Sequence, residues 1–190
     1  MTVRKVSTEL FAFVLLVSAS VSTIHAGERH GLLNQSAPDF SHSEQRDWFN
    51  VAPLSLKDLR GKVALVEFWT LGCPSCFRSI AWLKTLQERF ADRPVTIIAV
   101  HTPEFDHERD PTKVAAKIEE FGLTCPIMVD NDYSYWNAME NRFWPAFFLI
   151  DKHGVIRNVY FGETHEGDSQ ARKMATALSR VAKEDYTEPQ

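Results

Sequence analysis

The stretch VALVEFWTLGCPSC, residues 63–76, joins a continuous apolar run to two cysteines that stand two residues apart. Such a run is typical of a strand that is buried on both faces. Apolar residues then recur at helical spacing and predict a helix over about 75–91: Ile80, Leu83, Leu86 and Phe90. Cys73 therefore opens a helix, whose dipole stabilises a thiolate and lowers its pKa below the free value of about 8.5. The stretch predicts a dithiol for reversible thiol–disulfide exchange.

A C-x-x-C pair has other uses, which the rest of the sequence supports less well. A zinc site needs a second Cys or His pair, and the only other cysteine is Cys125, in an apolar context typical of a buried, inert thiol. Haem attachment needs His directly after Cys76, where Phe77 stands. A purely structural disulfide stays open as an alternative, although a bridge across so short a loop constrains the unfolded chain little.

The amino terminus has the pattern of an export signal over residues 1–26. Arg4 and Lys5 supply positive charge, residues 10–17 are apolar, and a small, polar stretch ends at Ala26, where we expect cleavage. The apolar part is short for a membrane span, so an uncleaved membrane anchor is the alternative. Export predicts a location in the bacterial periplasm or on the extracytoplasmic side of the membrane, where disulfides persist.

Length and composition predict one globular domain in a chain of 190 residues with a formal net charge of −4. We expect an N-terminal arm, extended or with short edge structure, over 27–53, the domain over 54–184 and a C-terminal tail over 185–190. No basic cluster with interleaved aromatic residues occurs, so nucleic-acid binding has no support. We expect no cofactor and no resident metal.

Strands and helices alternate in the first part of the domain, and a hairpin with a covering helix follows. A helix is expected between Asp110 and Gly122. Asp110 is its N-cap, Pro111 stands in its first turn, and Gly122 ends it. The other expected elements are strands at 95–100, around 125–129, at 146–150 and at 155–161, and a helix at 169–183. This order predicts an α/β sheet with a parallel part and an antiparallel edge.

Two segments together resemble the thioredoxin superfamily: residues 68–76, which end in the dithiol, and Trp144-Pro145 before the hairpin. More narrowly, the chain resembles the exported TlpA- and ResA-like thiol–disulfide oxidoreductases and the thioredoxin-like domain of DipZ-type proteins. Residues 100–105, 130–132 and 144–151 carry this narrower likeness, which covers roughly residues 37–180. The resemblance implies a thioredoxin-like fold: a mixed central sheet flanked by helices, with an insertion between its two halves.

The resemblance also implies roles for individual residues at the reacting centre. Cys73 matches the exposed attacking thiol, Cys76 the resolving thiol, and Pro145 the family's cis-proline, which lies against the dithiol. Glu67 stands six residues before Cys73, where thioredoxin has a buried aspartate. Burial should raise the pKa of Glu67 and make it the acceptor of the Cys76 proton. The alternative is a satisfied buried acid with no kinetic role.

Four residues are expected to face the client protein. Pro74 and Ser75 lie between the thiols, and the backbone of Trp144 matches the position that pairs with a client's extended chain. The alternative for the Trp144 side chain is core packing. ResA-like proteins often carry a glutamate three residues after the second cysteine, but Ser79 stands there. Glu104 is a candidate substitute, because it follows a strand that should lie parallel to 63–69 and end at the same sheet edge, and the alternative is a solvated loop residue.

These features predict a thiol–disulfide oxidoreductase that acts as a reductant on exported proteins. Its partners would be client proteins with disulfides or thiols and a redox partner that recycles the dithiol. A peroxiredoxin-like thiol peroxidase is one alternative, since Thr70 and Cys73 have the required spacing, although Val66 stands where that motif has proline. A Cu(I)-handling protein with Cys73, Cys76 and either His101 or His153 as ligands is another.

Overall fold

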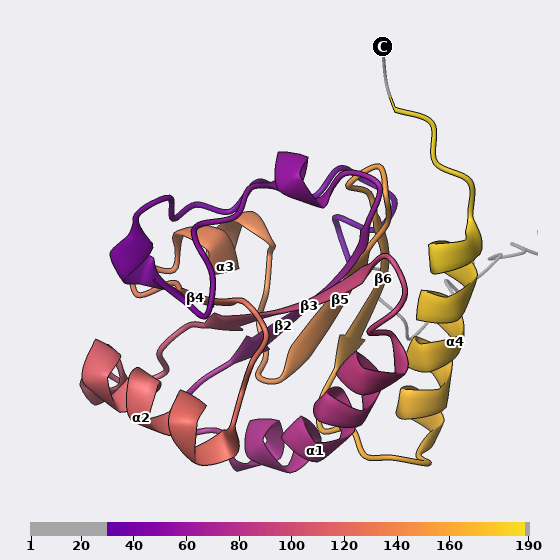
Figure 1. The fold of residues 1–190 in the computed structure, drawn as a ribbon. Coiled ribbons are helices and arrows are strands. Elements are labelled where there is room, and N and C mark those ends of the chain that lie inside the picture. The colour runs from indigo at the N-terminus through magenta and orange to yellow at the C-terminus, as the bar shows by residue number, and fades with distance from the viewer. Residues whose placement is uncertain (1–29, 189–190) are drawn as a thin grey trace, which may run out of the picture.

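The structure, a computed structural model, describes residues 30–188 and is built around a six-stranded sheet (Figure 1). The strands are β1 (Trp48–Phe49), β2 (Val63–Trp69), β3 (Val95–His101), β4 (Ile127–Val129), β5 (Ala146–Ile150) and β6 (Ile156–Phe161). The α-helices are α1 (Pro74–Arg89), α2 (Pro111–Phe121), α3 (Ser134–Ala138) and α4 (Ser169–Lys183). Within the described residues no helix is both long and apolar enough to cross a membrane. The predicted signal over 1–26 lies outside them.

The sheet is mixed, as the sequence predicts. Its strand order is β1-β4-β3-β2-β5-β6, with β2, β3 and β4 parallel, β5 antiparallel to β2, and β6 antiparallel to β5. Along the chain, β4 and α3 come after α2 and before the β5–β6 hairpin, and the insertion that the resemblance implies is expected in this part of the chain. Trp69 pairs with His101, and Phe68 pairs with Ala146, so β2 and β3 end at the sheet edge where β5 begins.

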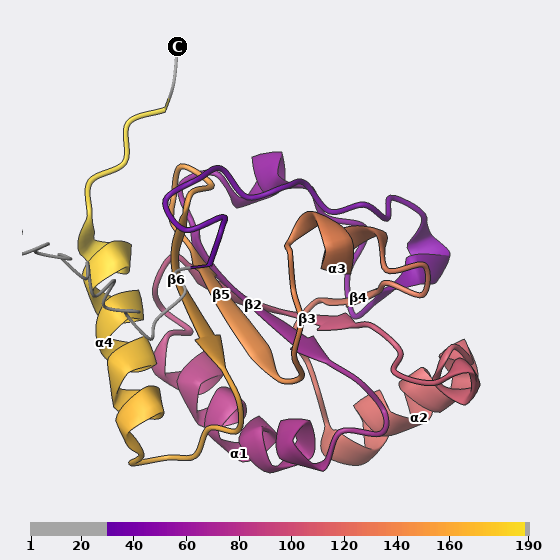
Figure 2. The ribbon, with the colours of Figure 1, turned by 180° about the vertical axis from the view of Figure 1, so that it is seen from behind.

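Alternation along β2 sends its side chains to two different cores. Leu65 faces the helical layer, where residues of α1 and α4 complete a hydrophobic cluster, and Glu67 lies on the same face two residues later. Val66 and Phe68 face the opposite layer, which the N-terminal segment and α3 cover (Figure 2). Glu67 therefore places a carboxylate under α1, which carries the dithiol.

Two short elements have only weak signals in the sequence. Strand β1 pairs antiparallel with β4 at the edge of the sheet, within the segment expected to be an extended arm or short edge structure. Helix α3 has five residues and few strong helix formers, yet it forms because the Asp130 carboxylate accepts the N–H groups of Tyr135 and Trp136. Both elements depend on contacts made after the chain has folded back on itself.

Candidate active site

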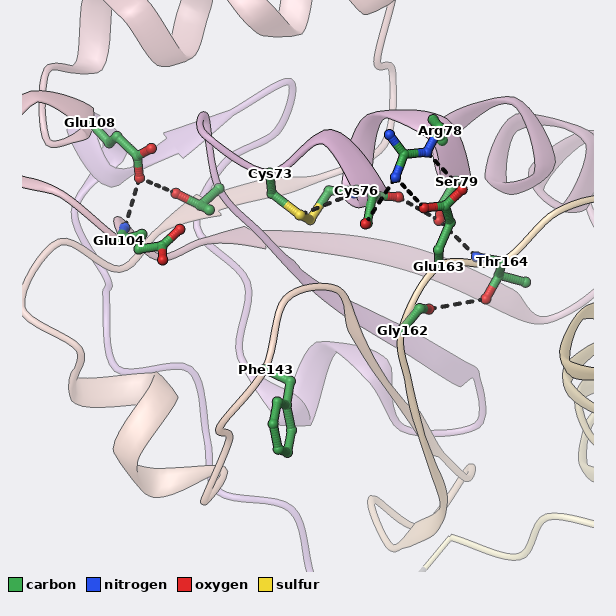
Figure 3. Close-up of a disulfide and its surroundings, with 12 residues drawn as sticks. Cys73, Cys76, Arg78, Ser79, Glu104, Glu108, Phe143, Gly162, Glu163 and Thr164 are labelled. Atoms are coloured by element: carbon green, nitrogen blue, oxygen red, sulfur yellow. Dashed lines mark hydrogen bonds and ion pairs between the residues drawn. A yellow bond between two sulfur atoms is a disulfide. The ribbon is translucent and has the colours of Figure 1, made fainter.

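Cys73 and Cys76 form a disulfide at the amino end of α1 (Figure 3). Cys73 is the N-cap residue, and its Sγ accepts the backbone N–H of Cys76 at 3.1 Å. Pro74 takes the first helical position, where no N–H is needed. Cys73 is 7% exposed and Cys76 is 1% exposed, so the expectation of an exposed Cys73 is wrong: both residues are buried in the disulfide, and Cys73 is the more accessible of the two. Ser75 is half-buried between them.

The Trp144–Pro145 peptide bond is cis, which confirms the conformation that the resemblance implies for Pro145. Ala146 directly follows and pairs with Phe68, so Pro145 lies at the dithiol edge of the sheet. The Trp144 ring is partly buried and packs against Trp136 with 4.3 Å between ring centroids. The Trp144 side chain is therefore mainly a packing residue, and pairing of its backbone with a client stays a prediction.

Glu67 is buried, as predicted, and lines a cavity behind Cys76. Its side chain is 5% exposed, and its Oε1 has no hydrogen-bond partner among the described residues. The cavity has a volume of about 20 Å³, and Cys76, Ile80, Ala99 and Cys125 also line it. This volume holds one water molecule. Burial raises the pKa of Glu67 to about 8, which confirms the expected direction.

Cys125 is buried on the other side of this cavity. Burial, and next the negative charge of Glu67, raise the pKa of its thiol to about 12. The thiol therefore stays protonated at neutral pH and is a poor nucleophile. The expectation of a buried thiol is confirmed.

Glu108 is a buried acid at this sheet edge that sequence reasoning missed. Its side chain is fully buried, and its Oε2 accepts hydrogen bonds from Thr70 Oγ1 and from the N–H groups of Glu104, at 2.7 Å, and Phe105, at 3.4 Å. Burial alone would raise the pKa of Glu108, but these hydrogen bonds outweigh it and the pKa is lowered.

Glu104, the residue proposed for this position, has an exposed side chain and contributes only its backbone N–H. The signal that could have found Glu108 is local. Its carboxylate caps the 3-10 turn Asp106–Glu108 by accepting the N–H of Phe105, and a glutamate at that offset is typical of a capping box.

The first turn of α1 is attached to the loop after β6. Ser79 Oγ donates to the carbonyl of Ser75 at 2.9 Å and accepts the N–H of Thr164 at 3.0 Å. Arg78 pairs with Glu163 at 2.5 Å, and this pairing holds the pKa of Glu163 at about 2 (Figure 3). The charge of Arg78 is thus matched by a carboxylate on the side of the disulfide away from Glu108.

A mixed sheet whose parallel strands and hairpin meet at a helix-capping disulfide, next to a cis-proline, is the architecture of thioredoxin-fold dithiol proteins, and this chain is one of that class. The family model described as Redoxin matches residues 32–178. The chain belongs to the Redoxin family.

Relatives and solved structures agree with this assignment. The chain is 40% identical to protein DipZ of Mycobacterium tuberculosis over 119 residues, which are 61% of this chain and 17% of that protein. It is 28% identical to the thiol-disulfide oxidoreductase YkuV of Bacillus subtilis over 130 residues, which are 68% of this chain and 86% of YkuV. The chain thus spans less than a fifth of DipZ and most of YkuV.

Two solved structures share the fold. A crystal structure of a thioredoxin-like superfamily protein matches with a TM-score of 0.70 and 26% identity, over 80% of this chain and 99% of that one. A thiol-disulfide isomerase from Corynebacterium glutamicum matches with a TM-score of 0.60 and 27% identity, over 78% of this chain and 98% of that one.

Proposed function

We propose that this chain is a thiol–disulfide oxidoreductase that reduces disulfides of exported proteins through Cys73 and Cys76. The observation that carries the proposal is the placement of the dithiol. Cys73 caps a helix and is the more accessible of the two cysteines, while Cys76 lies behind it, beside a buried carboxylate. YkuV, whose name gives the same activity, supports the assignment. The signal pattern in residues 1–26 supports export.

The reduced dithiol transfers two electrons to a client disulfide in two exchange steps. The Cys73 thiolate attacks one client sulfur, so a Cys73–client bond forms, the client disulfide breaks and one client thiolate leaves. Glu67, in its ionised form, takes the proton from Cys76 across the cavity. The Cys76 thiolate then attacks Cys73 Sγ, releases the second client thiolate and closes the protein disulfide. The two client thiolates take up two protons, and an external dithiol reduces the protein again.

Three aromatic side chains support binding of a protein client at this edge. Phe105, Phe143 and Phe161 are 54%, 56% and 41% exposed, and no other large apolar side chain of residues 30–188 is exposed. Phe105 follows β3, Phe143 precedes Pro145, and Phe161 ends β6, so all three lie at the end of the sheet that holds the dithiol. Exposed apolar side chains around a reactive centre are typical of a surface that binds apolar segments.

The reduction potential of the Cys73–Cys76 pair, measured in glutathione buffers, tests the direction of transfer. A value near −270 mV, about that of thioredoxin, is expected for a reductant, and a value near −120 mV would identify an oxidant. Reduction of insulin disulfides, with dithiothreitol as electron donor, tests the activity itself. Loss of that activity in Cys73→Ser, with retention in Cys125→Ser, is the expected result.

Client binding has a separate test. Replacing the exposed Phe143 with Ser should raise KM for a protein disulfide severalfold. The same variant should reduce a small aromatic disulfide at the wild-type rate, because that substrate needs no extended contact surface. Equal losses on both substrates would contradict binding through Phe143. Export is tested by the amino-terminal sequence of the secreted protein, which should begin at Gly27.

A further inference from the structure

The Glu108 carboxylate lies directly against the loop that leads into Cys73. Its Oε2 has three hydrogen-bond donors, whereas its Oε1 is buried and has no partner among the described residues. Oε1 occupies the space that a β-carbon on Gly72 would need, so only glycine permits this approach one residue before Cys73. The Cys73 N–H in turn donates to the carbonyl of Thr70 at 3.3 Å, in the same loop.

No cation neutralises Glu108 within residues 30–188. It forms no pair with Lys or Arg there. His101, at the end of β3, is fully buried with both ring nitrogens unpartnered, and burial lowers its pKa to about 4, so the ring is neutral at pH 7. The carboxylate therefore keeps a full negative charge on one side of the disulfide.

Two lysines of α2 lie on this side of the dithiol: Lys113 donates to the carbonyl of His107 at 3.2 Å, and Lys117 lies over the Phe77 ring and pairs with Glu120. Neither forms an ion pair with Glu108, and the remaining charged groups that the structure describes near the dithiol do not pair with it either.

Arg78, in the first turn of α1, is bound to Glu163 on the opposite side of the disulfide (Figure 3). Glu67 lies behind Cys76, and its raised pKa keeps it mostly protonated at pH 7. Glu104 and Asp106, in the loop that carries Glu108, have exposed side chains in contact with water.

We propose that Glu108 is a positioning residue whose negative charge makes the Cys73–Cys76 dithiol a stronger reductant. The disulfide carries no charge, whereas the reduced form holds a thiolate at Cys73. A buried carboxylate beside the Cys73 loop repels that thiolate and so destabilises only the reduced form. Oxidation, which removes two electrons and one proton from the thiolate–thiol pair, relieves the repulsion. The inference rests on the proposed exchange reaction.

The variant Glu108→Gln removes the charge and keeps the shape. We expect its equilibrium with glutathione to shift about tenfold towards the dithiol, which corresponds to a potential about 30 mV less negative. The matched control is Asp106→Asn, which changes net charge equally in the same 3-10 turn but at a fully exposed side chain. This variant should leave the equilibrium constant with glutathione unchanged.

The pH profile separates the charge effect from a purely structural one. The difference in reduction potential between wild type and Glu108→Gln should be largest above the pH at which the Cys73 thiol titrates. Thiolate absorbance at 240 nm measures that titration. Below that pH the difference should vanish, because the reduced form is then an uncharged dithiol. A difference that is constant with pH, or no difference, would overturn the inference.

Two further variants keep the test decisive. Thr70→Val removes a hydrogen bond but keeps the charge, so it should leave the potential near the wild-type value, and a shift as large as that of Glu108→Gln would overturn the inference. Glu108→Asp withdraws the charge by one methylene and should give a smaller shift in the same direction, even if the glutamine variant does not fold. A wild-type protein with no measurable dithiol–disulfide equilibrium would instead refute the proposed function.

Discussion

Glu67 and Glu108 are two buried carboxylates at one sheet edge, and they differ in ionisation. Glu67 lies on β2 among apolar side chains, where Oε1 finds no donor, and its pKa rises to about 8. Glu108 lies on the loop after β3, where three donors converge on Oε2, and its pKa is lowered. Side-chain burial is similar for the two residues, at 5% and 0% exposure. At Glu108 the hydrogen-bond donors outweigh the effect of burial on the pKa, whereas no donor offsets burial at Glu67.

The two acids also serve different thiols in the proposed mechanism. Glu67 shares a cavity with Cys76 and is suited to accept a proton. Glu108 abuts the loop before Cys73 and is suited to act as a fixed charge. Pairs of acids whose environments move their pKa values apart are a recurrent basis for such a division of roles.

The largest expected effect separates the two thiols themselves. Cys76→Ser should abolish turnover and accumulate a disulfide between Cys73 and the client, because no internal thiol remains to resolve it. Cys73→Ser should abolish turnover without that adduct. Non-reducing electrophoresis followed by mass spectrometry of the adduct measures both. An adduct formed through Cys76 in the Cys73→Ser variant would reverse the assigned roles.

The next effect is the pH dependence of stability caused by Glu67. Its folded pKa is raised from 4.5 to about 8, so its contribution to stability is complete below pH 4.5 and is lost as pH rises through 8. Relative to Glu67→Gln, the wild-type free energy of unfolding should fall by on the order of 4 kcal/mol over this range. Urea denaturation of the oxidised proteins measures it, and parallel pH curves would contradict the raised pKa.

For Glu108→Gln, the difference from wild type in the free energy of unfolding should change with pH in the opposite direction. The folded pKa of Glu108 is lowered, so the wild-type advantage should be present above the unfolded value of 4.5 and be lost as pH falls through the folded pKa. If both variants show the same sign, the comparison between the two acids is wrong.

A smaller effect is expected from Gly72→Ala. The new β-carbon would overlap Glu108 Oε1, and the carboxylate cannot move away without losing its donors, so we expect a loss of about 2–3 kcal/mol in unfolding free energy. In a Glu108→Ala background the same substitution should be nearly neutral. A double-mutant cycle measures the coupling, and additive effects would show that the two residues do not touch.

The smallest effect is expected from Thr70→Val, which removes one of the three donors to Glu108. We expect a loss of about 1–2 kcal/mol and a rise in the pKa of Glu108, which moves its environment towards that of Glu67. Carboxyl ¹³C chemical shifts against pH report the pKa directly. An unchanged pKa would mean that the backbone N–H groups of Glu104 and Phe105 alone stabilise the ionised Glu108 carboxylate.

The sequence by itself determined those features whose causes are local. The apolar run at 63–69 with cysteines at its end predicts a strand leading into a helix-capping dithiol, and the structure confirms both elements. Asp110 and Gly122 mark the ends of α2 because an N-cap carboxylate and a left-handed C-cap act within one turn. Glu67 was identified because it is a carboxylate within this apolar run and stands where the resembling family has a buried aspartate.

Only the tertiary structure decided which groups meet across elements. Thr70 and Glu108 are 38 residues apart, and Arg78 and Glu163 are 85 apart, so no spacing rule could pair them. Strand β1 and helix α3 likewise form from partners supplied by other segments. The ionisation of each buried acid follows from the same cause, because the number of donors around a carboxylate is set by the loops that pack against it. Sequence therefore located the reactive sulfurs, and packing set the charges around them.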